Sequence, residues 1–562
     1  MLILGVHVGH DSCAALIENG KILVDVQEER FSRVKHSDNF PIKSIEYCLK
    51  FASLKNINEL DYIAFASDKI QGTIKNVFNL KKRTYNLKKV VKQIIEKALG
   101  LDKVSMPIYY PDYRIDDKSK FITATHHLCH AASAYYTRGK NENCLIFTVD
   151  GVGDDHVSTA VWIGKGNEIK PLVKYGKEAA IGHAFSIVTE ALHWIHGDGE
   201  GKTMGLAPYG DYSKCKGVLD DIFPQFKDEI LVKNAMIGDA YSWHESGSSQ
   251  YHMEEARAVE VMIKKYSEED IAAEAQRKLE DNIVNLIFGW CKKTGIKNIA
   301  CAGGVFLNVK LNQRIWNNRK DLITSQHIYP NPGDSGLAVG AALHTYYRHH
   351  PFTGSTLDNL YKGPSYDNEE IEKLLKIRKL NYEYVENPAN KAAELLAENK
   401  IIAWFQGRME SGPRALGNRS ILMSPIKPEN KDIINASVKF REGFRPFCPS
   451  ILFEKRDIYL KDARDEFFMI TSFDMQQNKL SSIPATVHVD GTGRPQLVTK
   501  EKNPLFWELI NKFGELTGEY AVLNTSFNIM GEPIINTPKE AIRGFYDSGL
   551  DGIFINNFYL SK

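Results

Sequence analysis

Cys144-Leu-Ile-Phe-Thr-Val149 runs directly into Asp150-Gly-Val-Gly-Asp154, and this pairing is the clearest fold signal in the chain. Six mostly apolar residues followed by an acidic, glycine-containing loop are typical of a buried strand that reaches the edge of a sheet. Two further runs of this kind are Asn298–Ala302 before Gly303-Gly304, and residues 327–329 before residues 330–334. Ligands of open α/β sheets bind outside the carboxyl ends of strands, so we expect these loops to line a site.

Helices are expected between these strands. Ser267 is a suitable N-cap and Gly295 a suitable end for a helix whose apolar residues recur at helical spacing. The Asn19-Gly20 pair is a strong hairpin signal. Further expected elements are strands at 2–8, 14–17, 21–26 and 401–405, and helices at 336–346 and 391–399. Strands that end in glycine-rich loops and alternate with helices predict an α/β protein.

The length of 562 residues predicts more than one domain, because single cores rarely grow past about 250–300 residues. A stretch rich in turn residues begins near His350. We therefore expect a first domain at residues 1–355, a linker at 356–389 and a second domain at 390–562.

The formal net charge of +1 gives no electrostatic footprint for nucleic acid or anionic lipid. Eight cysteines without a C-x-x-C pair disfavour a zinc ribbon and suit a reducing compartment. The first residues lack the basic region of a signal peptide, and no apolar run approaches the roughly 18–20 residues that cross a bilayer. The expected location is therefore cytoplasmic, with neither a membrane nor a nucleic-acid polymer as partner.

A histidine pair provides half of a metal site. His126 and His130 are four residues apart, so on a helix they share one face. Asp150 and Asp334 follow strands at glycine-containing loops, where they would complete a mixed shell suited to iron, manganese or zinc. His127 is an alternative to His126 as ligand, and a surface cluster without metal is the alternative for the pair alone.

Glycines after the strands suit a nucleotide, since N–H groups unobstructed by a Cβ atom hold phosphates. The glycines concerned are Gly151, Gly153, Gly303 and Gly304. Asn308 would hydrogen-bond a ribose or a base, and the glycine-dense stretch from Gly197 to Gly210 favours a binding loop. Taken alone, a glycine pair is more often a plain turn.

His10-Asp11, at the first turn, offers a general base. A loop histidine deprotonates an alcohol readily because its reference pKa lies near neutrality. Lys35, in the charged run of residues 28–36, would neutralise a phosphate or polarise a carbonyl. The alternative for that run is a solvated charged face.

Arginines among glycines and serines near the C-terminus predict a polyanion site. Guanidinium groups bind phosphate bidentately, and arginines scattered for solubility would not select such apolar, glycine-rich neighbours. The members of this set are Arg408, Arg414, Arg419, Lys439, Arg441, Arg445 and Arg494, with Asn524 and Ser526 beyond them. We expect this set to bind phosphate or a nucleotide.

Together these motifs resemble the O-carbamoyltransferase family, which includes antibiotic-tailoring and nodulation enzymes. The matching motifs are Gly9-His-Asp-Ser12, Glu28-Glu-Arg-Phe-Ser-Arg33, His126-His-Leu-Cys-His-Ala131, Gly205-Leu-Ala-Pro-Tyr-Gly210, Gly303-Gly-Val-Phe-Leu-Asn308, Gly412-Pro-Arg-Ala-Leu-Gly417 and Asn524-Thr-Ser-Phe-Asn528. The resemblance implies a TsaD-like first domain, from the superfamily of actin, heat-shock ATPases and sugar kinases, and a YrdC-like second domain. Residues 67–111 match nothing in the family, and we expect them to help line an acceptor pocket.

The resemblance also implies a two-step reaction. Carbamoyl phosphate and ATP, with Mg²⁺, give carbamoyl-adenylate and pyrophosphate at the YrdC-like site. The carbamoyl group then passes to an acceptor hydroxyl at the TsaD-like site, where Fe²⁺ or a similar divalent metal binds the adenylate. The implied roles are His10 as base, Lys35 and Asn308 on the adenylate, His126, His130, Asp150 and Asp334 as metal ligands, and Arg414, Lys439, Arg445, Arg494, Asn524 and Ser526 around carbamoyl phosphate and ATP. The acceptor (a small molecule, a sugar or a nucleoside) and the oligomeric state stay open.

Three other functions account for part of these motifs. Threonylcarbamoyl transfer to tRNA is disfavoured because nucleic-acid binders concentrate basic charge. The hydrogenase-maturation carbamoyltransferases carry zinc-finger cysteines, which this chain lacks. A non-catalytic, actin-like ATP switch would explain the glycine loops of the first domain, but neither the His/Asp set nor the arginines.

Overall fold

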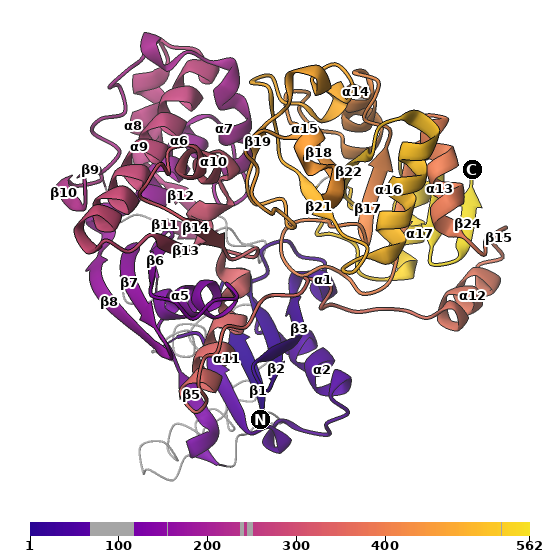
Figure 1. Ribbon diagram of the computed structural model, residues 1–562, viewed down its shortest axis with the longest axis horizontal. Coiled ribbons are helices and arrows are strands. Elements are labelled where there is room, and N and C mark those ends of the chain that lie inside the picture. The colour runs from indigo at the N-terminus through magenta and orange to yellow at the C-terminus, as the bar shows by residue number, and fades with distance from the viewer. Residues whose placement is uncertain (68–116, 154–155, 237–240, 244–250, 530) are drawn as a thin grey trace.

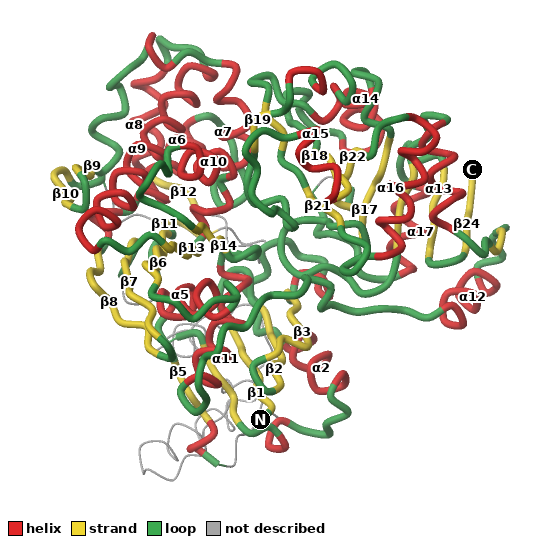
Figure 2. Tube along the Cα trace, in the orientation of Figure 1, coloured by secondary structure: helices red, strands yellow, loops and turns green. Residues whose placement is uncertain are grey.

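The computed structural model describes residues 1–67, 117–153, 156–236, 241–243, 251–529 and 531–562 (Figure 1). Helices and strands alternate through these residues, so the expected α/β class is confirmed (Figure 2). Most of the stretch expected to line an acceptor pocket, residues 68–111, lies outside this description, as does Asp154. Within the described part of the chain, no helix is both long and apolar enough to span a bilayer.

The first sheet has the strand order β3-β2-β1-β4-β5. Its strands are β1 (Leu2–His7), β2 (Cys13–Glu18), β3 (Lys21–Gln27), β4 (Tyr62–Phe65) and β5 (Phe121–Thr123). Strands β1 to β3 form an antiparallel meander through the expected Asn19-Gly20 turn, whereas β4 pairs with β1 in parallel. Alternate residues of β1 enter two cores: Leu4 and Val6 pack with α2 (Ile42–Phe51), and Ile3 packs with α11 (Leu337–Tyr347).

The second sheet has the order β14-β13-β6-β7-β8. Its strands are β6 (Cys144–Val149), β7 (Thr159–Lys165), β8 (Glu168–Tyr175), β13 (Asn298–Ala302) and β14 (Ser325–Ile328). Strands β6, β13 and β14 are parallel, so the loops after them meet at one edge, as the strand-and-loop pattern predicted. Helix α5 (His126–Tyr136) packs in the core on one face and α9 (Glu268–Thr294) in the core on the other.

Helix α11 lies between the two sheets and contacts both β1 and α5 at very short range. A Cβ atom on Gly340 would lie 1.9 Å from the carbonyl oxygen of Cys129 in α5, and one on Gly5 would lie 1.9 Å from the carbonyl oxygen of Ala338 in α11. Only glycine permits either approach. The first turn of α11 is thereby placed beside the end of β1 and the start of α5.

The C-terminal part of the chain forms an eight-stranded sheet (Figure 1, orange to yellow) in the order β15-β24-β23-β16-β17-β22-β18-β21. The strands are β15 (Glu383–Tyr384), β16 (Ile402–Phe405), β17 (Arg419–Met423), β18 (Cys448–Leu452), β21 (Gln496–Val498), β22 (Ala521–Ser526), β23 (Gly552–Ile555) and β24 (Phe558–Ser561). Helices α13 (Pro388–Ala397) and α16 (Pro504–Thr517) share one core with the sheet, and α12 (Asn368–Ile377) and α17 (Pro538–Tyr546) share another.

Residues 356–389, expected as a linker, contain regular structure. Helix α12 packs on the C-terminal sheet, and β15 pairs with its edge strand β24. The boundaries of the domains themselves stay a prediction.

The remaining α-helices of the described residues are α1 (Glu29–Ser32), α6 (Ile181–Ala191), α7 (Glu200–Leu206), α8 (Glu254–Ile263), α10 (Val309–Asn317), α14 (Asn430–Ile434) and α15 (Arg456–Tyr459). The remaining strands of these residues are β9 (Gln225–Lys227), β10 (Ile230–Lys233), β11 (Tyr241–Trp243), β12 (Tyr251–Met253), β19 (Phe473–Asp474) and β20 (Thr492–Gly493).

Arginine side chains that donate to main-chain carbonyls join the N-terminal and C-terminal parts. Arg30 Nη2 donates to the oxygen of Gly412 at 2.8 Å, Arg33 Nη1 donates to that of Ile534 at 2.7 Å, and Arg408 Nη2 donates to that of Leu23 at 2.8 Å. A hydrogen bond from Ser411 Oγ to the buried carboxyl of Asp25 crosses the same junction.

Burial raises the pKa of Asp25 to about 7, against hydrogen bonding from Ser411 and the charge of Lys362. Because the unfolded carboxyl ionises near pH 3.8, the unfolded chain loses this proton first as the pH rises. The group therefore removes about 1.4 kcal/mol of unfolding free energy per pH unit between about pH 4 and 7.

Asp25→Asn should abolish that loss. The difference in unfolding free energy, variant minus wild type, should grow from pH 4 to 7 and stay level above pH 7. Urea unfolding at pH 4.5, 6 and 8 measures it, with the exposed Asp221→Asn as control. A difference that does not change with pH would contradict the assignment.

Candidate functional site

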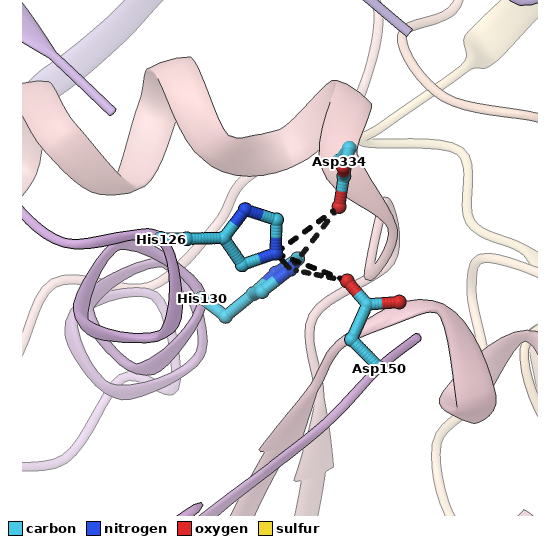
Figure 3. A group of neighbouring side chains, drawn as sticks. All are labelled: His126, His130, Asp150 and Asp334. Carbon is cyan, nitrogen blue, oxygen red and sulfur yellow. Dashed lines mark hydrogen bonds and ion pairs between the residues drawn. The ribbon is translucent and has the colours of Figure 1, made fainter. Parts of the chain in front are cut away.

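Four side chains from three segments of the chain converge at the edge of the second sheet (Figure 3). Thr125 Oγ1 accepts a hydrogen bond from the N–H of Leu128 and caps α5, so the helix begins at His126 and presents His130 one turn later. Asp150 follows β6, and Asp334 lies just before α11. The ligand atoms of the four side chains lie within 4.8 Å of one another.

The two imidazoles and two carboxylates face a common centre. His126 Nε2 and His130 Nε2 are 3.1 Å apart, and they lie 3.1 and 3.0 Å from Asp150 Oδ2. The same nitrogens lie 3.5 and 3.4 Å from Asp334 Oδ1, a buried oxygen that accepts no hydrogen bond from any described residue. The cluster offers two nitrogen and two oxygen atoms as ligands, and this set fits a divalent transition metal.

Electrostatics in this cluster call for a positive charge. Burial would lower the pKa of His130, but its hydrogen bond to Asp150 and the negative charges of Asp150 and Asp334 raise it to about 9. Burial would raise the pKa of Asp150, yet both imidazoles hold it well below its usual value. Without a metal, a proton on His130 offsets the carboxylates, so metal binding would release that proton.

His127 does not face this cluster. It is fully buried, and its ring nitrogens lie 2.9 Å from Thr148 Oγ1 and 2.8 Å from the carbonyl oxygen of Val157. Both nitrogens therefore have partners elsewhere. Of the two alternatives that the sequence left open, the geometry favours His126.

The glycine loops hold Asp150 in place. The N–H of Gly304 donates to Asp150 Oδ1 at 3.1 Å, which turns Oδ2 toward the histidines. The N–H groups of Gly303 and Gly153 donate to carbonyl oxygens of Pro332 and Val157, both at 2.7 Å. Three of the four amides expected to cradle a phosphate therefore already have acceptors within the chain.

Gly151 and Asn308 differ in their surroundings. A Cβ atom on Gly151 would lie 3.1 Å from Nε2 of His183, so this loop lies against an imidazole. The buried amide of Asn308 caps α10 and exchanges two hydrogen bonds with Gln276, at 2.8 and 3.0 Å. In this structure, Asn308 shapes the loop and does not point a free amide at a ligand.

His10 adjoins the cluster, and Lys35 lies farther along the same surface. His10 Nε2 is 3.1 Å from Asp334 Oδ2, so one carboxylate serves both the histidine pair and the expected base. Lys35 Nζ pairs with the carboxylate of Asp198 in the glycine-dense loop. Asp11 follows His10 in the sequence and His36 follows Lys35, but the sequence predicted no role for either residue.

A second group of predicted site residues lies in the C-terminal part, where five cationic groups act on one another. They are Arg414, Lys439, Arg441, Arg445 and Arg494. Of these, only Arg445 forms an ion pair among the described residues, with Glu442 at 3.9 Å. Five cations gathered around the buried Lys439, with one long ion pair among the described residues, form a candidate anion site.

The pKa values show the strain of this arrangement. Burial, and then the charges of Arg494 and Arg445, lower the pKa of Arg414 to about 9. Burial, and then the charges of Arg445 and Arg494, lower the pKa of Arg441 to the same value. The pKa of Lys439 falls well below its usual value through burial and the charges of Arg441 and Arg445. A bound phosphate would relieve this repulsion.

Polar residues of β22 and β18 line the same place. Lys439 Nζ donates to Asn528 Oδ1 at 2.8 Å, and Ser526 Oγ donates to that same oxygen, also at 2.8 Å. Asn524 Nδ2 donates to Ser450 Oγ at 3.0 Å. Arg494 Nη2 lies 2.8 Å from the sulfur of Cys448, a neighbour that sequence reasoning missed.

Two arginines of the expected polyanion set do not join this group. Arg419 is fully buried and donates to carbonyl oxygens of Gln406 and Gly407. Arg408 donates to those of Gly363 and Leu23. Both residues hold the backbone. Arg441 does belong to the group, although no separate role was given to it, and its place two residues after Lys439 was the available signal.

Comparison with known proteins identifies the class of this α/β protein. The family model for the carbamoyltransferase N-terminus matches residues 2–343, and the model for the carbamoyltransferase C-terminus matches residues 393–562. The chain therefore belongs to the carbamoyltransferase family and is a carbamoyl-transferring enzyme, which confirms the family resemblance found in the sequence.

Named relatives extend over most of the chain. Nodulation protein NolNO of Sinorhizobium fredii is 33% identical over 98% of this chain and 79% of its own length. Nodulation protein U of Rhizobium tropici is 26% identical over 94% of this chain and 91% of its own length. Among solved structures, HypF of T. kodakarensis covers 61% of this chain and 48% of its own at 16% identity and a TM-score of 0.31, too low to support a conclusion.

The His/Asp cluster generates a test of metal binding. His130→Ala removes one buried ligand of four, so the purified protein should lose at least about ten-fold in bound divalent metal per chain, as measured by plasma mass spectrometry. The exposed His349→Ala is the matched control and should keep the metal. Equal metal content in wild type and His130→Ala would remove His130 from the ligand set.

Proposed function

We propose that this carbamoyltransferase is an ATP-dependent O-carbamoyltransferase. Water hydrolyses carbamoyl phosphate to carbamate and inorganic phosphate, and the carbamate oxygen then displaces pyrophosphate from the α-phosphorus of ATP to form carbamoyl-adenylate. An acceptor hydroxyl then attacks the carbamoyl carbon, and AMP leaves. The observation that carries this proposal is the coexistence of two oppositely charged sites, a group of five cations around the buried Lys439 and a His/Asp cluster.

The cationic group suits the first step. Carbamoyl phosphate and the triphosphate of ATP are among the most highly charged small substrates, and their charges would meet the five cations described above. We assign carbamoyl phosphate and ATP, with Mg²⁺, to Arg414, Lys439, Arg445, Arg494, Asn524 and Ser526. Arg441 joins this assignment because its charge acts on Lys439. The charges of Arg445 and Arg494 act on Arg441 in turn.

The His/Asp cluster suits the second step. A carbamate is a poor electrophile until its oxygen bears a good leaving group, and AMP provides one. His10 would take the proton of the acceptor hydroxyl, and Lys35 would exchange Asp198 for the phosphate of the adenylate. Held by His126, His130, Asp150 and Asp334, a divalent metal such as Fe²⁺ would add charge stabilisation as that phosphate departs.

The finer fold assignment belongs to the same proposal. A TsaD-like unit at residues 1–355 would hold the His/Asp cluster, and a YrdC-like unit at residues 390–562 would hold the cationic group. The support is that the two sites lie on separate sheets with separate cores.

Adenylate formation tests the first step. Arg494→Ala should lower carbamoyl-phosphate-dependent pyrophosphate release by about 10²-fold, because a charged donor to the phosphates is lost. The matched control is Arg456→Ala, whose side chain pairs with the exposed Asp457 and Asp465 in the same part of the chain. Wild-type release that does not require carbamoyl phosphate would refute the proposed function.

His10→Ala tests the division of labour. The variant should still give a single-turnover burst of pyrophosphate, while transfer falls by about 10²–10⁴-fold through loss of the base. Transfer is read as a gain of one carbamoyl mass on candidate acceptors, and as AMP release. Loss of the pyrophosphate burst in His10→Ala would show that the two sites do not divide the reaction in this way.

A further inference from the structure

The ring of His10 lies between two carboxylates that differ in their other contacts. Its Nδ1 is 3.1 Å from Asp11 Oδ2, and its Nε2 is 3.1 Å from Asp334 Oδ2. The second oxygen of Asp334 faces the imidazoles of His126 and His130. The Nε2 contact thus belongs to the His/Asp cluster, whereas the Nδ1 contact is independent of it.

Asp11 is itself held from its other side. His36 Nδ1 lies 2.8 Å from Asp11 Oδ1, so each carboxylate oxygen of Asp11 has its own imidazole partner. The backbone N–H of His36 donates to Glu29 Oε2 at 2.9 Å, and its Nε2 lies 3.6 Å from Asp198 Oδ1. A continuous series therefore runs from His10 through Asp11 and His36 to Asp198.

The backbone at both intermediate residues is left-handed. Asp11 has φ of 60° and His36 has φ of 52°, a region that residues with a Cβ atom rarely adopt. Such backbone persists only where the surroundings hold it, and it concentrates at functional sites. Here it turns the two side chains toward each other from separate loops, one after β1 and one after α1.

The ionisation of this pair suits a fixed contact. Burial would raise the pKa of Asp11, but the charge of His36 and hydrogen bonds from both imidazoles hold it well below its usual value. Burial would lower the pKa of His36, but the charge of Asp11 and its hydrogen bond, with help from Asp198 and Glu29, raise it well above its usual value. The pair is thus a carboxylate and an imidazolium across the neutral range.

We propose that Asp11 and His36 are positioning residues for His10, an inference that rests on the proposed function. Asp11 accepts the Nδ1–H of His10 and fixes the ring, and Nε2 becomes the proton acceptor when the acceptor hydroxyl replaces the contact with Asp334 Oδ2. As the acceptor oxygen bonds to the carbamoyl carbon, its proton passes to Nε2, and AMP leaves with the electron pair of the broken bond. His36 prevents Asp11 from turning away.

A double-mutant cycle separates positioning from a merely structural role. Asp11→Asn keeps the shape but removes the charge, and it should lower transfer by about 10²-fold or more while the pyrophosphate burst stays within about 2-fold of wild type. Because Asp11 acts through His10, the double variant His10→Ala with Asp11→Asn should be no slower than His10→Ala alone. Losses that multiply in the double variant would overturn the proposal.

Two replacements of His36 test which of its contacts matters. The amide nitrogen of His36→Asn falls near the position of Nδ1, facing Asp11, and Asn tolerates the left-handed backbone. The amide of His36→Gln reaches the position of Nε2, facing Asp198. Transfer should stay within about 5-fold of wild type in His36→Asn and fall about as far as Asp11→Asn in His36→Gln. Equal losses in both would overturn the role given to the Nδ1 contact.

Transfer is measured with an acceptor that gains carbamoyl mass, and as AMP release with water as the probe acceptor. Wild type that forms no pyrophosphate with carbamoyl phosphate would refute the proposed function itself. Wild type that forms pyrophosphate but releases AMP no faster than His10→Ala would refute the base, and with it the positioning role. Circular dichroism melts of every variant identify a failure to fold, and His36→Asn then remains the folded reference.

Discussion

The close approach of α11 to β1 and α5 is the constraint on which the geometry of the His/Asp cluster depends. With glycine at positions 5 and 340, the helix axis comes near enough for backbone atoms of neighbouring elements to touch. Any side chain at either position would push α11 outward. Asp334 precedes the first turn of α11, so this packing brings its carboxylate within reach of both the His126/His130 pair and His10.

The His/Asp cluster and the cationic group have opposite imbalances of charge. The His/Asp cluster brings two carboxylates together and needs positive charge, which a proton on His130 or a metal supplies. The cationic group collects five positive side chains and needs an anion. Each site therefore gathers charge of one sign, which a ligand of the opposite charge would offset.

Local patterns predicted the elements well, and side-chain chemistry less evenly. The helix from Ser267 to Gly295 and the strand Cys144–Val149 follow from periodicity and caps, which act within a few residues. The His/Asp cluster was predictable because parallel strands end at one edge of a sheet. The contact between Asp11 and His36 was not, since it depends on two left-handed residues in separate loops. The hydrogen bonds of Asn308 and Arg419 were not predictable either. The partner of Asn308 is Gln276, far along the chain, and Arg419 donates to the backbone carbonyl of Gln406.

The junction between the two parts ties the sites mechanically. Arg30 donates to the carbonyl of Gly412, two residues before Arg414, and itself lies five residues before Lys35. A second contact across the junction is the ion pair of Lys202 with Glu442 at 2.7 Å. Lys202 lies four residues after Asp198, the loop residue that pairs with Lys35. Both connections therefore run from the segments around Lys35 to the segments around the cationic group. A displacement of the Arg414 loop would consequently reach the Lys35 segment through the Arg30 side chain rather than through the sheets.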